Sequence, residues 1–154
     1  LENMARVAQA TDVPIMADES VWTAHDVLRL ATWKAAEMIS CYYTKPGGLM
    51  KAKKLLAVAE TAGMRSDING SGEMGVGNAA NLHLAASTSI IDLPGTIPVT
   101  STAEVVRTNI AGHSYLDDII KEPFVYKDGH LVVPEGPGLG IELDEAKVAK
   151  YRVG

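Results

Sequence analysis

The sequence lacks most of the features that mark secreted, membrane or nucleic-acid-binding proteins. It has one cysteine, Cys41, so no internal disulfide can form, and a reducing, cytoplasmic location is expected. Its net charge of −5 does not favour a nucleic-acid or anionic-membrane partner. No apolar run approaches the roughly 20 residues that span a bilayer, and no signal peptide is visible. With 154 residues, 47% of them hydrophobic, the chain is long and apolar enough to bury a sizeable core.

Helix and strand patterns alternate along the first part of the chain. Apolar residues at helical spacing predict helices over residues 1–10, 24–36, 49–62 and 78–86. Short β-rich runs predict strands over residues 13–17, 38–43, 64–68 and 89–93. Short buried strands that alternate with helices indicate a parallel α/β sheet, and units this regular suit a barrel as well as an open sheet.

Some of these element ends carry recognisable local signals. Thr23 and Asp26 fit a capping box that opens the second helix. Gly63 stands where a left-handed residue would end the third. After Pro94 the pattern changes: a helix is predicted over 104–110, and a hairpin around Asp128-Gly129 is followed by a short helix from residue 144. This tail is not another strand–helix unit.

Candidate functional residues stand at the predicted carboxyl ends of the strands, where parallel α/β folds place their sites. They are Asp18 with Glu19, Tyr42 with the nearby Lys45, Glu73 in a glycine-rich loop, and Asp92. Carboxylates suit a hard cation such as Mg²⁺. The structural alternatives are a helix-start charge for the acids, an amphipathic packing residue for Tyr42, and a solvated loop position for Lys45.

A nucleotide-binding interpretation competes for the glycine-rich loop. Residues 70–75 match G-x-G-x-x-G, and Asp92 lies 20 residues beyond Gly72, where a ribose-binding acid is expected. This would make the chain an NAD-binding oxidoreductase module. Against it, Glu73 would place a carboxylate at the pyrophosphate position, and the preceding run, 65–67, is too polar for a first Rossmann strand.

Four segments carry motifs that occur in the same order in one known family. They are VPIMADES (13–20), KPGGL (45–49), EMGVG (73–77) and VPEGPGLGIEL (133–143). The chain resembles, over nearly its whole length, the C-terminal part of the enolase superfamily, of the muconate-lactonizing and mandelate-racemase type.

This resemblance implies the C-terminal half of a modified (β/α) TIM barrel with a tail that joins a capping domain. Residues 1–100 would be the second half of the barrel, and 101–154 would close it and return to the cap. The N-terminal half of the same enzyme, with its base and two further metal carboxylates, would be a necessary partner. Members of the family are often homo-oligomers, so a homo-oligomer is expected.

The family abstracts a proton next to a carboxylate, and Mg²⁺ stabilises the resulting charge. By resemblance, Asp18 is a metal ligand, Glu19 hydrogen-bonds near the site, and Glu73 faces it. The muconate-lactonizing branch has a catalytic lysine where this chain has Tyr42, 24 residues after Asp18. Lys45 aligns with a different, non-catalytic lysine.

A tyrosine is a poor base at neutral pH but can serve as an acid. The substitution therefore favours a one-base reaction on a small hydroxy- or amino-acid derivative, either dehydration or epimerisation, and resembles cis-3-hydroxy-L-proline dehydratases. A muconate-type cycloisomerase or racemase is the alternative within the family.

Half a barrel exposes two sheet edges and much apolar surface. We therefore expect the isolated chain of residues 1–154 to aggregate or to unfold without a cooperative transition. Size-exclusion chromatography and thermal circular dichroism measure this, and a monodisperse monomer with a sharp melt would contradict it.

Overall fold

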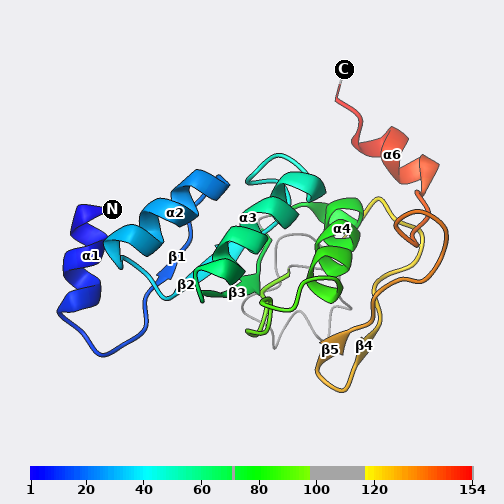
Figure 1. Cartoon of the computed structure of the whole chain (residues 1–154). Helices are drawn as coiled ribbons and strands as arrows, with labels where there is room; N and C mark the ends of the chain where they lie inside the picture. Colours follow the sequence, from blue (N-terminus) through cyan, green and yellow to red (C-terminus); the bar gives the residue numbers. More distant parts are fainter. Residues whose placement is uncertain (71, 98–116, 154) are drawn as a thin grey trace. The chain divides into compact units, whose positions relative to one another are not determined.

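Helices and strands alternate in the computed structural model, which describes residues 1–70, 72–97 and 117–153 (Figure 1). The helices are α1 (Glu2–Gln9), α2 (Ala24–Trp33), α3 (Leu49–Thr61), α4 (Met74–Ala86) and α6 (Glu145–Tyr151). The strands are β1 (Met16–Ala17), β2 (Met38–Cys41), β3 (Arg65–Ile68), β4 (Tyr126–Lys127) and β5 (His130–Leu131). The chain divides into two compact units, Leu1–Asn69 with Ser87–Gly95, and Gly70–Ala86 with Thr96–Gly154.

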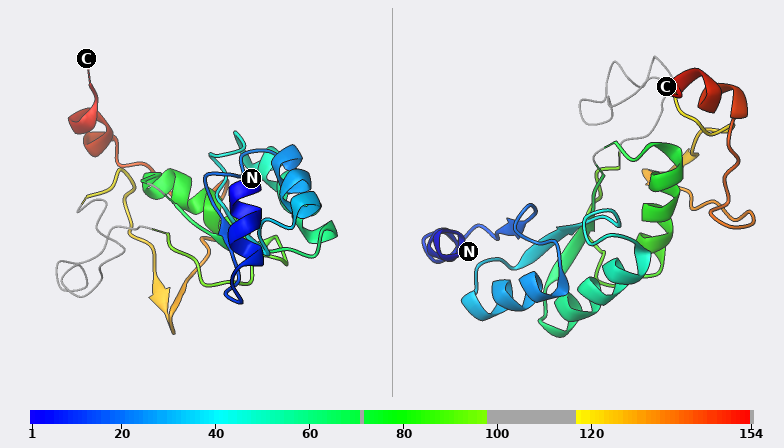
Figure 2. Two further views of the ribbon diagram at one scale, coloured as in Figure 1. Left: turned by 90° about the vertical axis from the view of Figure 1, so that its left-hand side faces the viewer. Right: turned by 90° about the horizontal axis from the view of Figure 1, so that it is seen from above.

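The first unit is built on a parallel sheet in the order β1-β2-β3. Ala17 pairs with Ile39, and Ser40 pairs with Asp67, so the three strands run in register toward one common edge. A parallel bridge between Ser66 and Ile91 extends the ladder beyond β3. Helices α2 and α3 pack on each other and cover one face of this sheet (Figures 1 and 2).

The helix-covered face of the sheet holds the apolar core of this unit. Ala17, Ile39 and Cys41 are at most 1% exposed, as are residues on the inner faces of α2 and α3, among them Leu30 and Leu56. Because side chains alternate along a strand, the residues between them belong to the opposite face. That face carries polar groups, among them Ser40 and its strand partner Asp67.

Local signals fix the ends of α2 and α3. The predicted capping box is confirmed: the Thr23 hydroxyl accepts from the Asp26 N–H, and the Asp26 carboxylate accepts from the Thr23 N–H. Lys34 takes a left-handed conformation (φ 50°) and ends α2 at Trp33, short of the predicted residue 36. Gly63 is left-handed as predicted, with φ 71°.

The second unit contains α4, the hairpin and the last helix. Gly75 of α4 packs against Ile120, so closely that a Cβ on the glycine would lie 2.5 Å from an Ile120 methyl group. Ile120 also forms an antiparallel bridge with Leu143. The predicted hairpin forms between β4 and β5, and the Asp144 carboxylate caps α6 by accepting from two backbone N–H groups, as predicted.

Several predicted boundaries were wrong. The strand predicted over 13–17 is reduced to β1, and the one predicted over 89–93 is reduced to the bridge at Ile91. Helix α4 begins at Met74, inside the G-x-G-x-x-G motif, rather than at residue 78. The helix predicted over 104–110 lies outside the described residues. Both segments pair with a neighbouring strand on one side only, and the hydrogen-bonded ladder does not reach the ends of the predicted ranges.

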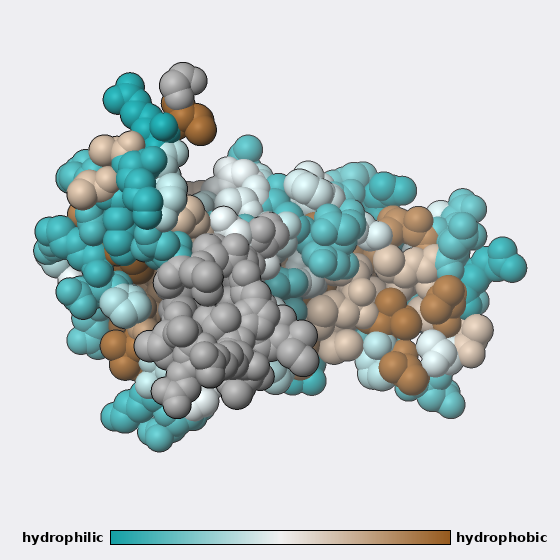
Figure 3. Space-filling view, turned by 180° about the vertical axis from the view of Figure 1, so that it is seen from behind, coloured by the Kyte–Doolittle hydropathy of each residue, from teal (hydrophilic) through white to brown (hydrophobic). Residues whose placement is uncertain are grey.

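Large apolar side chains remain exposed on the first unit. Val13, Trp22, Leu28 and Trp33 are each 45–67% exposed. Figure 3, which views the molecule from behind, shows hydrophobic and hydrophilic side chains interspersed on its surface. Within the described residues, no helix combines the length and apolarity needed to cross a membrane.

The buried thiol of Cys41 offers a test of this core. Removal from water raises its pKa to about 12, so the nucleophilic thiolate is scarce at neutral pH. In the protein that carries these residues, we expect Cys41 to resist iodoacetamide at pH 8 and to react rapidly in urea. Mass spectrometry measures the labelling, and rapid labelling of the folded protein would contradict the placement.

Candidate active site

Asp18 and Tyr42 stand immediately after neighbouring parallel strands. Asp18 follows β1, which ends at Ala17, and Tyr42 follows β2, which ends at Cys41. Because both strands run the same way, their carboxyl ends lie at the same edge of the sheet. The sequence-based placement of the two residues at one strand edge is therefore confirmed.

Lys45 joins these two strand ends through its ammonium group. Its Nζ donates to Asp18 Oδ1 at 2.8 Å, to the Asp18 carbonyl at 2.7 Å and to the Ser40 carbonyl at 3.0 Å. The residue is only 7% exposed. The solvated loop position considered for Lys45 was therefore wrong, because all three ammonium protons have protein acceptors.

The turn after β2 brings Lys45 back to the sheet. The Gly47 and Gly48 N–H groups donate to the carbonyls of Thr44 and Tyr43, and both glycines have positive φ, 87° and 120°. This conformation favours glycine, and it lets the KPGG segment reverse direction within a few residues. Lys45 Nζ consequently lies 5.3 Å from the centroid of the half-buried Tyr42 ring, a cation–π distance.

Asp67 is a further acid at this place that sequence reasoning missed. It lies in β3, opposite Ser40, and is 8% exposed. Its Oδ1 is fully buried and has no hydrogen-bond partner among the described residues. The signal was present, since Asp67 is an acid within a predicted strand, but its polarity was taken only as a reason to doubt a Rossmann strand.

The surroundings of Asp67 disfavour its charged form. Burial raises the pKa of this carboxyl above its ordinary value, and the Asp18 charge raises it further. Hydrogen bonds from the Ser40 hydroxyl and the Cys41 backbone, together with the Lys45 charge, lower the pKa but do not cancel these effects. Asp18, Lys45 and Asp67 thus interact electrostatically on the face of the sheet opposite α2 and α3.

The other predicted site residues have different environments. Glu19 is exposed, and its carbonyl accepts from the Trp22 indole N–H at 2.8 Å. Asp92 pairs with Arg65, the first residue of β3, with both contacts at 3.0 Å and both side chains about half exposed. Glu73 belongs to the second unit, where its carboxylate accepts from the Gly72 N–H. The roles predicted for these three near a substrate stay predictions.

His83 also belongs to the second unit. Its Nε2 lies 3.1 Å from the Leu139 carbonyl, so the ring nitrogen donates.

The donor set near Asp18 can supply part of a metal site. Lys45 engages Asp18 Oδ1, and no described residue donates to Oδ2, so one hard oxygen ligand is compatible with a divalent cation. Among the described ranges there is no group of three His, Cys, Asp or Glu side chains that could hold a metal. Further carboxylate ligands would have to come from elsewhere.

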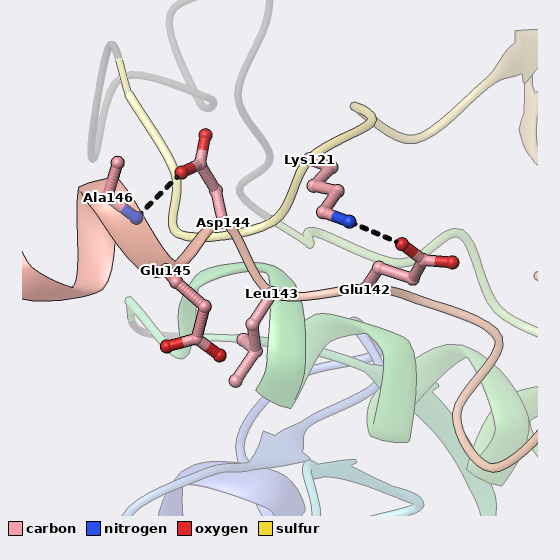
Figure 4. Close-up of a pocket in the computed structure, with 6 residues that line it drawn as sticks. All are labelled: Lys121, Glu142, Leu143, Asp144, Glu145 and Ala146. Carbon is pink, nitrogen blue, oxygen red and sulfur yellow. Dashed lines mark hydrogen bonds and ion pairs between the residues drawn. The ribbon is translucent and has the colours of Figure 1, made fainter.

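A separate surface pocket lies in the second unit (Figure 4). It is lined by residues that include an exposed Lys121–Glu142 ion pair at 2.7 Å and the helix-capping Asp144. None of the predicted site residues lines it. This pocket is therefore not the candidate active site.

Comparison with known proteins identifies the family. Residues 1–147 match the family described as Enolase C-terminal domain-like, of the MR/MLE type. The chain is 37% identical over 145 residues to muconate cycloisomerase 1 of Rhodococcus opacus, covering 94% of this chain and 35% of that protein. It is 33% identical to the L-Ala-D/L-Glu epimerase of Clostridium acetobutylicum, covering 92% of this chain and 36% of that protein.

Solved structures give the same result. A muconate cycloisomerase from Azorhizobium caulinodans superposes with a TM-score of 0.79 at 36% identity, over 97% of this chain and 39% of that one. A 2-chloromuconate cycloisomerase from Rhodococcus opacus gives 0.85 at 28% identity, over 99% and 38%.

The chain therefore belongs to the enolase C-terminal domain-like family, and the predicted α/β barrel fold class is confirmed. It spans between a third and two fifths of the length of these relatives. The family assignment leaves the glycine-rich loop inside an enolase-type domain and gives the dinucleotide-binding alternative no support.

The buried ammonium of Lys45 can be tested by substitution. Lys45→Met leaves the Ser40 and Asp18 acceptors without their donor, so we expect the free energy of unfolding to fall by about 1–3 kcal/mol. The half-exposed Asp18 can recover water, which keeps the loss below that of a fully buried pair. Urea denaturation of the protein that carries these residues measures it.

Lys53→Met is the matched control. Lys53 also donates to a carbonyl, that of Ser87, but the contact is exposed, so the expected loss is below about 1 kcal/mol. Equal losses for the two variants would contradict the central position of Lys45.

Proposed function

We propose that this chain is the C-terminal part of a Mg²⁺-dependent enzyme that abstracts the proton next to a carboxylate. The reaction then completes a dehydration or an epimerisation of a small hydroxy- or amino-acid derivative. A cis-3-hydroxy-L-proline dehydratase is the most specific form of this proposal. The observation that carries it is the cluster of Asp18, Lys45 and Tyr42 at the carboxyl edge of a parallel sheet.

Asp18 would contribute one carboxylate oxygen to the cation, and Lys45 would hold that carboxylate in place. The ammonium contacts both the side chain and the backbone of Asp18, so it restrains the side-chain rotamer. A preplaced ligand avoids reorganisation during the reaction. When bound, Mg²⁺ supplies positive charge to oxygens of the substrate carboxylate.

Tyr42 would act as the acid. Its ring lies beside the Lys45 ammonium, with 5.3 Å between Nζ and the ring centroid. The proton abstracted from the substrate would go to a base outside this chain, and the proton given to a departing hydroxyl would come from Tyr42. A tyrosine in place of a second lysine thus favours elimination over two-base racemisation.

The proposal requires a partner segment. The relatives are two to three times longer than this chain, and the exposed apolar residues of the first unit need a cover. An N-terminal segment that supplies the base, further carboxylates and the early strands would meet both requirements. We also propose a cytoplasmic homo-oligomer, on the grounds of the buried free thiol and the family.

A second candidate is a muconate-type cycloisomerase or racemase. Several relatives carry such names, including the muconate cycloisomerase 1 of Rhodococcus opacus and an N-succinylamino acid racemase of Amycolatopsis. The presence of Tyr42 favours the dehydratase, because racemisation with two lysines would need a lysine at that position.

Substitution of Tyr42 separates these possibilities. In the complete enzyme, Tyr42→Phe removes the proposed acid, so we expect dehydration to fall by about 10²–10⁴-fold. Exchange of the substrate α-proton with D₂O should continue, because the base is not in this chain. Proton NMR of product formation and of deuterium incorporation measures both rates.

Tyr43→Phe is the control for loss of a neighbouring hydroxyl and should leave dehydration unchanged. Near-wild-type dehydration by Tyr42→Phe would exclude Tyr42 as the acid. Loss of α-proton exchange together with dehydration would instead assign the tyrosine to the first step.

A further inference from the structure

Asp67 occupies a position that neither packing nor the proposed metal site explains. A buried residue in the middle of a short strand is usually apolar, as Ile68 and Ile39 are here. Asp67 instead keeps a carboxyl group with one oxygen, Oδ1, buried and without a partner in the described part of the chain. Such a group costs stability, so its retention indicates a ligand or a functional role.

The strand register places Asp67 on the same face of the sheet as Ser40 and Asp18. Ser40 pairs with Asp67 across β2 and β3, and Ala17 pairs with Ile39 one step earlier. Continuing this register places Asp18 next to Ser40, so Asp18, Ser40 and Asp67 form one row. Neighbouring strands are about 4.8 Å apart, so Asp18 and Asp67 are separated by roughly 10 Å along the row, with Ser40 between them.

The hydrogen bonds of Asp67 satisfy only part of its carboxyl group. The Ser40 hydroxyl and the Cys41 N–H donate to the carboxyl group, and the Asn69 amide donates in turn to Ser40 Oγ at 3.3 Å. These contacts orient the carboxyl group but leave its Oδ1 atom without a hydrogen-bond partner in the described part of the chain. A purely structural aspartate would have both oxygens engaged.

A metal shared between Asp18 and Asp67 does not suit this arrangement. The Lys45 ammonium already lies against Asp18 Oδ1 and the Ser40 carbonyl, the intermediate position of the row. A divalent cation bridging the two acids would meet that positive charge. A singly charged donor that reaches Oδ1 alone avoids this repulsion.

We propose that Asp67 binds the ammonium or secondary-amine nitrogen of the substrate. The substrate carboxylate would lie on the Asp18 side of the row. The ligand class is therefore a small α-amino or cyclic imino acid with a charged nitrogen, rather than a dicarboxylate or an N-acyl derivative. This inference rests on the proposed α-proton abstraction and specifies its substrate class.

The test compares two isosteric substrates in the complete enzyme. One is cis-3-hydroxy-L-proline, and the other is the tetrahydrofuran acid in which oxygen replaces the ring nitrogen. We expect the wild type to prefer the amine by at least about 30-fold in kcat/KM for α-proton exchange, since the oxygen compound leaves Asp67 unpaired. In Asp67→Asn, this preference should fall to within about 3-fold, because kcat/KM for the amine substrate decreases.

Two controls separate binding from folding and from metal ligation. Asp67→Asn should melt no lower than the wild type, because it replaces a buried carboxyl, and calorimetric Mg²⁺ affinity should be unchanged. A drop in Mg²⁺ affinity in Asp67→Asn would assign Asp67 to the metal and overturn the inference.

The remaining outcomes distinguish the inference from the proposed function. An amine preference that survives in Asp67→Asn would overturn the inference alone. So would a wild type that exchanges α-protons of muconolactone or N-succinyl amino acids but not of the proline derivative. Absence of α-proton exchange with every carboxylate would overturn the proposed function, and the inference with it.

Discussion

The contact between the Lys45 ammonium and Asp18 determines the rest of the site. Three acceptors on two strands share one buried cation, and that sharing ties the end of β1 to the end of β2. The turn at Gly47 and Gly48 reverses the chain beside Lys45, and the same ammonium lies 5.3 Å from the centroid of the Tyr42 ring. The Lys45 charge also lowers the pKa of Asp67, which the Asp18 charge raises.

The fold supplies a rigid background for this polar row. Ala17, Ile39 and Cys41 seal the face under α2 and α3, and alternation directs the intervening residues to the other face. Parallel strands in register place those residues at equal heights. A row of polar side chains on adjacent strands therefore needs no unusual backbone, only polar residues at alternate positions that face the same side of the sheet.

Sequence reasoning predicted what local patterns determine. The capping box at Thr23, the left-handed Gly63 and the Asp144 cap are short-range features, and the helical periodicity of α3 extends over several turns. Strand lengths depend on partners far along the chain, which is why β1 shrinks to two residues. The burial of Lys45 and Asp67 was missed for the same reason: each is polar by type, and only long-range pairing places them against Asp18 and Ser40.

If Asp18 holds a cation against the substrate carboxylate, its charge is indispensable to the first chemical step. Deuterium exchange at the substrate α-carbon, followed by proton NMR in the complete enzyme with Mg²⁺, reports that step without requiring turnover. The account predicts exchange in the wild type and its loss in Asp18→Asn, with near-UV circular dichroism unchanged. Exchange at the wild-type rate in Asp18→Asn, or in the presence of excess EDTA, would contradict it.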